Sequence, residues 1–267
     1  MAKGKHYYIR KLHRYLGLIL GVQFLFWTLG GLYFSWNNID EVHGDQLRKE
    51  KRFLPANLNL VSPQVALQEL KKTATVDSIK AIQLIEILGV PTYQMSYFTK
   101  TEDVKKGLGL SGAHGGGHAG GGSKTRLANA ETGQLRSALG KDEAVQLAQY
   151  NVVEPALVGK VEYLTEVGSH HEYREKPLPA WAITFKQPSC TVYISAEYGT
   201  FQAIRHNQWR VFDFLWMLHT MDFQGRDNFG NLLLKVFSVL GLVTVLSGFA
   251  LYFVSSPTFR KKRRTGS

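Results

Sequence analysis

The chain has 267 residues, 44% of them hydrophobic and 20% charged, which suits one or two domains with a core and excludes a disordered chain. The net charge is +11, but ten of the 32 Lys and Arg residues lie at the two ends, and the other 22 face 21 Asp and Glu. A nucleic-acid-binding protein gathers its charge on a folded face, so we expect no nucleic-acid partner. The single cysteine, Cys190, excludes an intrachain disulfide and a Cys-based zinc site, and we predict no resident metal.

Residues 1–15 form a basic segment, and residues 16–36 form the first apolar run. This run has the length of a membrane-spanning helix, which needs about 20 residues. A secretory signal is the alternative, but its apolar part is shorter, about 7–15 residues, and ends at a small-residue cleavage site that is missing here. We therefore interpret residues 16–36 as an uncleaved transmembrane helix.

The next part of the chain reads as two related units, residues 61–140 and 141–208. In each unit, a helix precedes three strands and a turn. The turn is Ala130-Glu131-Thr132-Gly133 in the first unit and Ala196-Glu197-Tyr198-Gly199 in the second. Pro91 and Pro179 introduce corresponding strands, and Ser62-Pro63 is a typical helix start. The pattern predicts an α+β fold in which two helix-plus-antiparallel-sheet repeats lie between two transmembrane helices.

A Gly/His-rich loop, residues 105–124, interrupts the first repeat. Its composition buries nothing, so we expect a flexible linker that is dispensable for folding. His114 and His118 lie in it, but two flexible histidines without a carboxylate would bind a metal ion only weakly.

Residues 209–222 are rich in aromatic side chains and predict an interfacial helix, with Arg210 and Asp213 facing water. The second apolar run follows at residues 232–254, and a basic tail at 255–267 ends the chain. Because basic segments stay on the cytoplasmic side, we expect both termini in the cytoplasm. The central domain would then be periplasmic, and the protein would span a bacterial inner membrane twice, with the lipid bilayer as its first partner.

Small residues mark faces where membrane helices approach one another. Gly17 and Gly21 form one such pair, and Thr244 and Gly248 form another. Two helices are few for a membrane site, so we expect a homodimer with four.

Several of these segments resemble PepSY-associated transmembrane proteins. The resemblance lies in Leu12-His13-Arg14-Tyr15-Leu16-Gly17-Leu18, in Pro179-Ala180-Trp181-Ala182-Ile183, in Leu218-His219-Thr220 with the glycines that follow, and in Ser247-Gly248 of the second apolar run. Many relatives have four spans, whereas this chain has two. The resemblance implies PepSY modules outside the membrane. In some relatives it also implies bis-histidine haem b that serves the reduction of ferric siderophores in iron uptake.

Four histidines are candidate haem ligands: His13 at the cytoplasmic end of the first span, and His219, His43 and His206 toward its outer side. The ordinary alternative for each is a surface, packing or capping role. A helix rises about 1.5 Å per residue, so one haem cannot join His13 to an outer histidine. His219 follows an aromatic stretch, and Asp222 is placed to orient its ring.

No enzyme motif is present, and no catalytic residue is assigned. Two functions therefore remain open. The first is a haem-dependent membrane oxidoreductase of the ferric reductase type, which passes electrons to a periplasmic ferric chelate. The second is a non-enzymatic, membrane-anchored module with a regulatory or accessory role that binds a peptide or a partner protein. Imidazoles facing one another across an apolar slot would favour the first, and histidines in water or in hydrogen bonds would favour the second.

Overall fold

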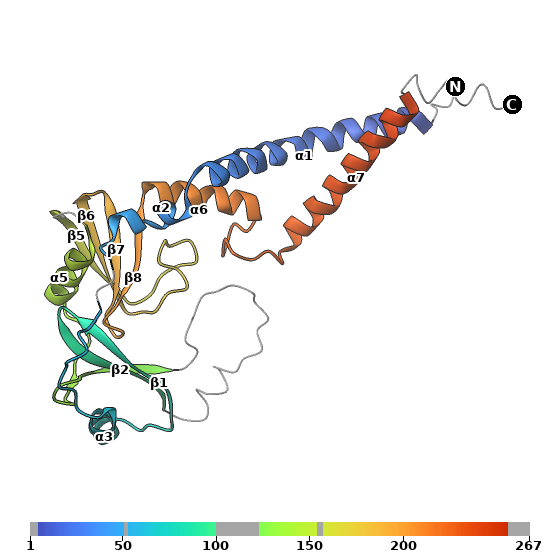
Figure 1. The fold of residues 1–267 in the computed structure, drawn as a ribbon. Coiled ribbons are helices and arrows are strands. Elements are labelled where there is room, and N and C mark those ends of the chain that lie inside the picture. Colours follow the sequence, from blue (N-terminus) through green and yellow to red (C-terminus); the bar gives the residue numbers. More distant parts are fainter. Residues whose placement is uncertain (1–4, 51–52, 100–122, 154–156, 256–267) are drawn as a thin grey trace. The chain divides into compact units, whose positions relative to one another are not determined.

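The computed structural model describes residues 5–50, 53–99, 123–153 and 157–255 (Figure 1). All but the last two residues of the predicted Gly/His-rich loop lie outside these ranges. Contacts divide the chain into two units, which we describe separately. Unit 1 comprises residues 1–37 and 212–267, and unit 2 comprises residues 38–211.

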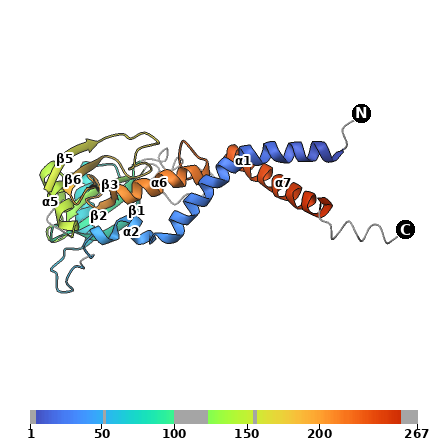
Figure 2. The same ribbon diagram turned by 90° about the horizontal axis from the view of Figure 1, so that it is seen from above.

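Unit 1 contains two long apolar helices, α1 (Lys5–Trp36) and α7 (Leu232–Ser255). Within them, Arg10–Trp36 and Leu232–Phe253 are long and apolar enough to cross a membrane, in agreement with the two predicted spans. The start of α1 and the end of α7 lie at the same end of the unit (Figures 1 and 2). A side chain at Gly241 would come within 3.1 Å of the Phe24 ring, so this glycine lets the two helices approach closely.

Helix α6 (Asn207–Thr220) begins in unit 2, and its larger part packs on α1 in unit 1. Phe212 contacts Phe34 at a ring-centroid distance of 4.8 Å, and His219 contacts Trp27 at 5.8 Å. Residue numbers rise along α6 as they fall along α1, so the two helices run antiparallel. Gln23, the most polar residue of the first apolar run, donates a hydrogen bond of 2.9 Å to the Leu218 carbonyl. It thereby satisfies one of the carbonyls that a helix end leaves without a partner.

Asp213 does not face water, contrary to the sequence-based prediction. Its side chain is 6% exposed and forms an ion pair with Arg226, in the connection between α6 and α7. A periodic sequence pattern cannot show this, because the chain folds back after α6 and covers the polar side of the helix. The next helix, α7, is capped by Asn231, whose side-chain oxygen accepts the Leu234 N–H at 2.8 Å.

Unit 2 contains two four-stranded antiparallel sheets, each preceded by a helix. The first repeat comprises α3 (Pro63–Thr73), β1 (Ser78–Ile87), β2 (Val90–Phe98), β3 (Lys124–Asn129) and β4 (Leu135–Arg136). The second comprises α5 (Lys141–Asn151), β5 (Leu157–Leu164), β6 (Ala180–Gln187), β7 (Cys190–Ser195) and β8 (Phe201–His206). Before them lie α2 (Ile39–His43) and a 3-10 turn, η1 (Asp45–Leu47). The sequence predicted three strands per repeat, whereas a fourth follows each turn.

The two repeats share the same hydrogen bonds at the predicted turns. Gly133 N–H binds the Asn129 carbonyl at 2.8 Å, and Gly199 N–H binds the Ser195 carbonyl at 3.0 Å. Ala130 and Ala196 each donate to the carbonyl of the proline that introduces the neighbouring strand. Both turn glycines have positive φ, +76° and +67°, a conformation that favours glycine. These equivalent bonds support the predicted internal repeat.

Each helix packs on its own sheet, but the cores are not separate. α3 covers Tyr93, Met95 and Tyr97 of β2. The core beneath α5 includes Ile183, Val192 and Ile194 of the second sheet, but also Ile87 and Leu127 of the first. Cys190 lies in this second core, 2% exposed, and burial raises the pKa of its thiol to about 11, as expected for a structural cysteine. Unit 2 is therefore one domain built from two repeats.

Candidate functional site

His13 is engaged in contacts between α1 and α7. Its Nδ1 lies 2.7 Å from the Ser247 hydroxyl, and a side chain at Gly248 would come within 3.3 Å of its ring. The Thr244 and Gly248 pair predicted from the sequence thus faces α1, with Thr244 9% exposed. This geometry gives His13 a packing and hydrogen-bonding role in the helix pair.

We expect Gly248→Leu to weaken the pairing of α1 and α7 by about 1–3 kcal/mol, because the added side chain meets the His13 ring. Resistance to dodecyl sulfate, followed by tryptophan fluorescence of the full-length protein, measures the loss. Gly31→Leu is the matched control, since nothing lies within 4 Å of the side-chain position at Gly31. Equal resistance of Gly248→Leu and the unmodified protein would contradict the packing role.

His219 lies within an aromatic cluster between α1 and α6. Its ring is parallel to Trp216 at an interplanar angle of 11° and contacts Phe34 at a centroid distance of 5.9 Å. Nδ1 of His219 and Nε1 of Trp27 are both buried and have no hydrogen-bond partner among the described residues. A buried polar nitrogen without a partner costs free energy. These two nitrogens are therefore candidates to contact a bound ligand.

Asp222 does not orient His219, contrary to the prediction. Its carboxylate accepts the backbone N–H groups of Gln224, Gly225 and Asn228, at 3.0–3.2 Å, and so shapes the connection to α7. Helical spacing placed Asp222 near His219, but α6 ends at Thr220 and the next residue, Met221, has a φ of +52°. The change of direction turns the carboxylate toward its own loop.

The other two candidate histidines lie in unit 2. His43 is exposed at the end of α2, and His206, the last residue of β8, lies 3.3 Å from the Gln46 amide. Burial lowers the pKa of His206, and the charges of Arg210 and Arg205 act in the same direction. Neither histidine lies in an apolar slot. The structure thus brings none of the four histidines into a facing pair within either unit.

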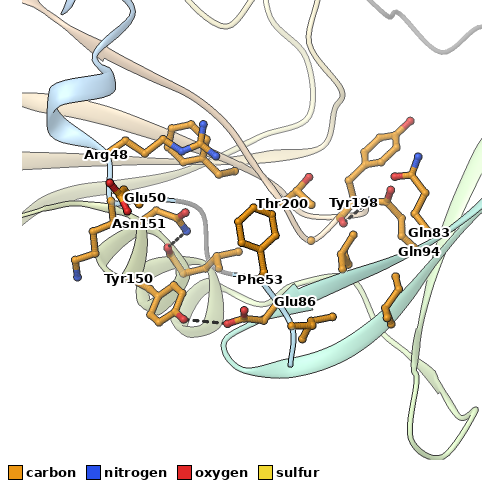
Figure 3. A pocket seen from close by; sticks show the side chains of 17 residues that line it. Arg48, Glu50, Phe53, Gln83, Glu86, Gln94, Tyr150, Asn151, Tyr198 and Thr200 are labelled. Atoms are coloured by element: carbon orange, nitrogen blue, oxygen red, sulfur yellow. Dashed lines mark hydrogen bonds between the residues drawn. The ribbon is translucent and has the colours of Figure 1, made fainter. Parts of the chain in front are cut away.

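A groove of about 660 Å³ lies in unit 2, where the two repeats meet (Figure 3). One wall is β1 at Gln83–Glu86, and the opposite side consists of the β7–β8 turn and the end of α5. Gln94 of the first sheet donates a hydrogen bond of 2.7 Å to the Tyr198 carbonyl of this turn. Residues 48–50 and 53–54 complete the lining.

Both apolar and polar side chains line the groove. Leu84 is 41% exposed and Phe53 is 84% exposed, and Phe53 projects into the middle of the groove between Thr200 and Glu86 (Figure 3). Oε1 of the Glu86 carboxylate accepts the Tyr150 hydroxyl at 2.9 Å and the Gly89 N–H at 3.1 Å, so this oxygen already has two donors. The volume lies in the range of ligand-binding pockets, about 300–1,000 Å³.

Local sequence patterns do not reveal the groove. Its lining comes from segments that are distant in the chain: 48–50 with 53–54, β1 with Gln94, the end of α5, and 198–201. Only the exposed apolar residues of β1 gave a local signal, and that signal requires knowledge that β1 is an edge strand.

Comparison with protein families matches residues 10–267 to the PepSY-associated TM region. Comparison with curated proteins gives no match, and neither does comparison with solved structures. The match covers both apolar helices and the whole of the domain between them, including every part of the chain that resembled the family. The chain is a membrane protein and belongs to the PepSY-associated transmembrane family.

Proposed function

We propose that this protein is a membrane-anchored binding module, with both termini in the cytoplasm and unit 2 in the periplasm of a bacterium. The basic residues at both ends support this topology, because such segments remain cytoplasmic. In this proposal unit 2 binds a peptide or a segment of a partner protein in the groove between its repeats. The groove itself is the observation that carries the proposal.

The contacts of the histidines favour this function over electron transfer. His13 is hydrogen-bonded to Ser247, His43 is exposed, and His206 lies against Gln46. Bis-histidine ligation of haem needs two imidazoles that approach one iron from opposite sides. None of these three histidines faces a second imidazole among the described residues of its unit, so their surroundings do not favour bis-histidine ligation.

Peptide selection tests the proposed function. Full-length protein in lipid nanodiscs is used to select from a phage-displayed library of random dodecapeptides, with empty nanodiscs as the counter-selection. We expect enriched peptides that compete with one another and that protect groove residues, such as Tyr150 and Tyr198, from chemical labelling. Absence of enrichment, or protection confined to residues outside the groove, would overturn the proposal.

A second candidate function is haem-dependent electron transfer, and one observation favours it. His219 places a buried, unpartnered nitrogen in a wall of aromatic rings, which suits a haem ligand. A bound haem b would supply one-electron transfer toward a periplasmic ferric chelate. Of the four candidate histidines, His219 is the one that lies in a wall of aromatic rings, so the opposite ligand would come from a second copy. Gly17 and Gly21, which have no neighbour within 4 Å, offer α1 a face for such a homodimer.

If haem binds, His219→Ala should abolish the Soret band of protein expressed with a haem supply. His170→Ala should leave the band unchanged, because His170 lies in a loop of unit 2. If His219 only packs, its loss should lower stability by about 1–3 kcal/mol with no spectral change. An unchanged Soret band in a haem-loaded His219→Ala protein would remove His219 as a ligand.

A further inference from the structure

Among the described strands, β1 lies at the edge of its sheet and borders the groove. The first sheet has the order β1-β2-β3-β4, so β1 pairs only with β2 among the described strands. β1 has ten residues, and Gln83–Glu86 form a wall of the groove. An edge strand presents alternating N–H and C=O groups without partners, and such an edge pairs readily with another extended chain. The chemistry of this wall therefore selects a ligand with a polypeptide backbone.

The groove beside this edge accepts an apolar side chain. Leu84 and Phe53 are partly or largely exposed there, and Phe201 and Leu147 also line it. Covering Leu84 and Phe53 would remove apolar surface from water, which favours binding. The four wall residues extend over about 13 Å, and the ten residues of β1 over about 33 Å. The wall thus matches a short extended segment.

At one end of the groove, the Arg48 guanidinium has no carboxylate partner among the described residues. The guanidinium stacks on the Phe201 ring at 4.4 Å. Lys49 adds a second cation, whereas Glu50 supplies one carboxylate at this end (Figure 3). Charge complementarity therefore favours a ligand that places a carboxylate beside Arg48.

We propose that the groove binds an extended peptide segment that pairs with the free edge of β1, packs an apolar side chain against Leu84 and Phe53, and places a carboxylate beside Arg48. This inference rests on the proposed binding function and specifies its mode. Strand addition supplies affinity through the main chain, and the side-chain contacts supply selectivity. The carboxylate comes from an acidic side chain or from the C-terminus of the ligand.

Backbone methylation of the peptide tests strand addition. The probe is the tightest-binding dodecapeptide from the selection, resynthesised with one N-methyl group at each position in turn. In an added strand, alternate N–H groups face β1. We expect methylation at these positions to weaken binding by about tenfold or more, and at the intervening positions by less than about twofold. Loss without this period of two would overturn the strand mode.

Variants of the protein test the side-chain contacts. Leu84→Ser should weaken binding by about five- to tenfold. Tyr163→Ser is the matched control, because Tyr163 opposes Trp181 in the second repeat as Leu84 opposes Tyr93 in the first. It should leave the affinity unchanged. Thermal unfolding of both variants shows whether a weaker affinity comes from a loss of structure, and a similar loss in both variants would contradict the assigned groove.

Arg48→Gln should weaken binding of the carboxylate-bearing peptide by about tenfold. The peptide is also made with an amidated C-terminus and with each acidic side chain replaced by its amide. One of these amide peptides should bind the unmodified protein more weakly, and its affinity should not fall further with Arg48→Gln. The group replaced in that peptide is the carboxylate that lies beside Arg48. Equal sensitivity of all forms would overturn the role of Arg48. If the methylation, Leu84 and Arg48 experiments fail but the peptide still competes for the groove, strand addition is rejected and the proposed binding function is retained.

Discussion

Gly199→Ala is expected to lower the free energy of unfolding of unit 2 by about 2–4 kcal/mol, a large effect for the addition of one methyl group. Gly199 has a φ of +67°, and a side chain there would come within 2.5 Å of Ile87 and 3.0 Å of Leu127. Both neighbours belong to the first sheet, whereas Gly199 belongs to the second repeat. The added methyl group would therefore strain the turn and also force the two repeats apart.

Gly89→Ala separates these two costs. Gly89 has a similar φ, +84°, but nothing lies within 4 Å of its side-chain position. It should lose only the conformational part, about 1 kcal/mol. Chemical unfolding of full-length protein in nanodiscs, followed by circular dichroism, measures both variants. Equal losses would show that the turn at Gly199 does not hold the repeats together.

Glu172→Gln is expected to lower the free energy of unfolding of unit 2 by about 1–3 kcal/mol. The Glu172 carboxylate accepts hydrogen bonds from the Arg210 guanidinium at 2.8 and 3.1 Å and from the Tyr193 hydroxyl at 2.8 Å. Arg205 also donates to the Glu172 carbonyl, at 3.1 Å. The neutral amide would leave a cluster of cations without its carboxylate.

The same substitution should change the response to acid. Burial by itself raises the pKa of Glu172, but the hydrogen bonds from Arg210 and Tyr193 and the charges of Arg210 and Arg205 lower it below its ordinary value. A carboxyl group with a lowered pKa stabilises the fold above its unfolded pKa, about 4.3, and loses this contribution as the pH falls through the folded pKa.

The unmodified protein should therefore lose stability below about pH 4.3 more steeply than Glu172→Gln. Unfolding midpoints measured from pH 6 to pH 3 test this expectation. Parallel curves for the two proteins would show that Glu172 is not held in its charged form by these contacts. Glu69→Gln is the control, because Glu69 pairs with Lys72 on an exposed helix surface, where ion pairs contribute little.

The groove and the contacts of Glu172 belong to the same domain, unit 2. Both depend on contacts between segments that lie far apart in the chain, and the Gly199 turn belongs to the groove lining as well as to the shared core. A variant that separates the repeats should therefore lose peptide binding along with stability. Leu84→Ser changes a side chain that is 41% exposed, so it should lose binding with a smaller loss of stability.

The sequence alone determined the elements that local patterns encode. Two uninterrupted apolar runs predicted α1 and α7, because a membrane-spanning helix requires that length. Ser62-Pro63 predicted the start of α3, and the Ser62 hydroxyl indeed accepts the Gln64 N–H at 3.3 Å. The repeated Ala-Glu-x-Gly turns predicted the duplication, because a positive φ restricts the residue choice at one position.

Only the tertiary structure decided which faces and edges these elements leave free. Asp213 and Asp222 were misjudged because the chain reverses after Thr220 and brings its own loop against them. The edge of β1 and the side chain of Arg48 line a groove because the β7–β8 turn and the end of α5 form its opposite side. A sequence pattern reports the period of an element, whereas pairing and burial depend on partners that lie far away in the chain, such as Gln94 and Tyr198.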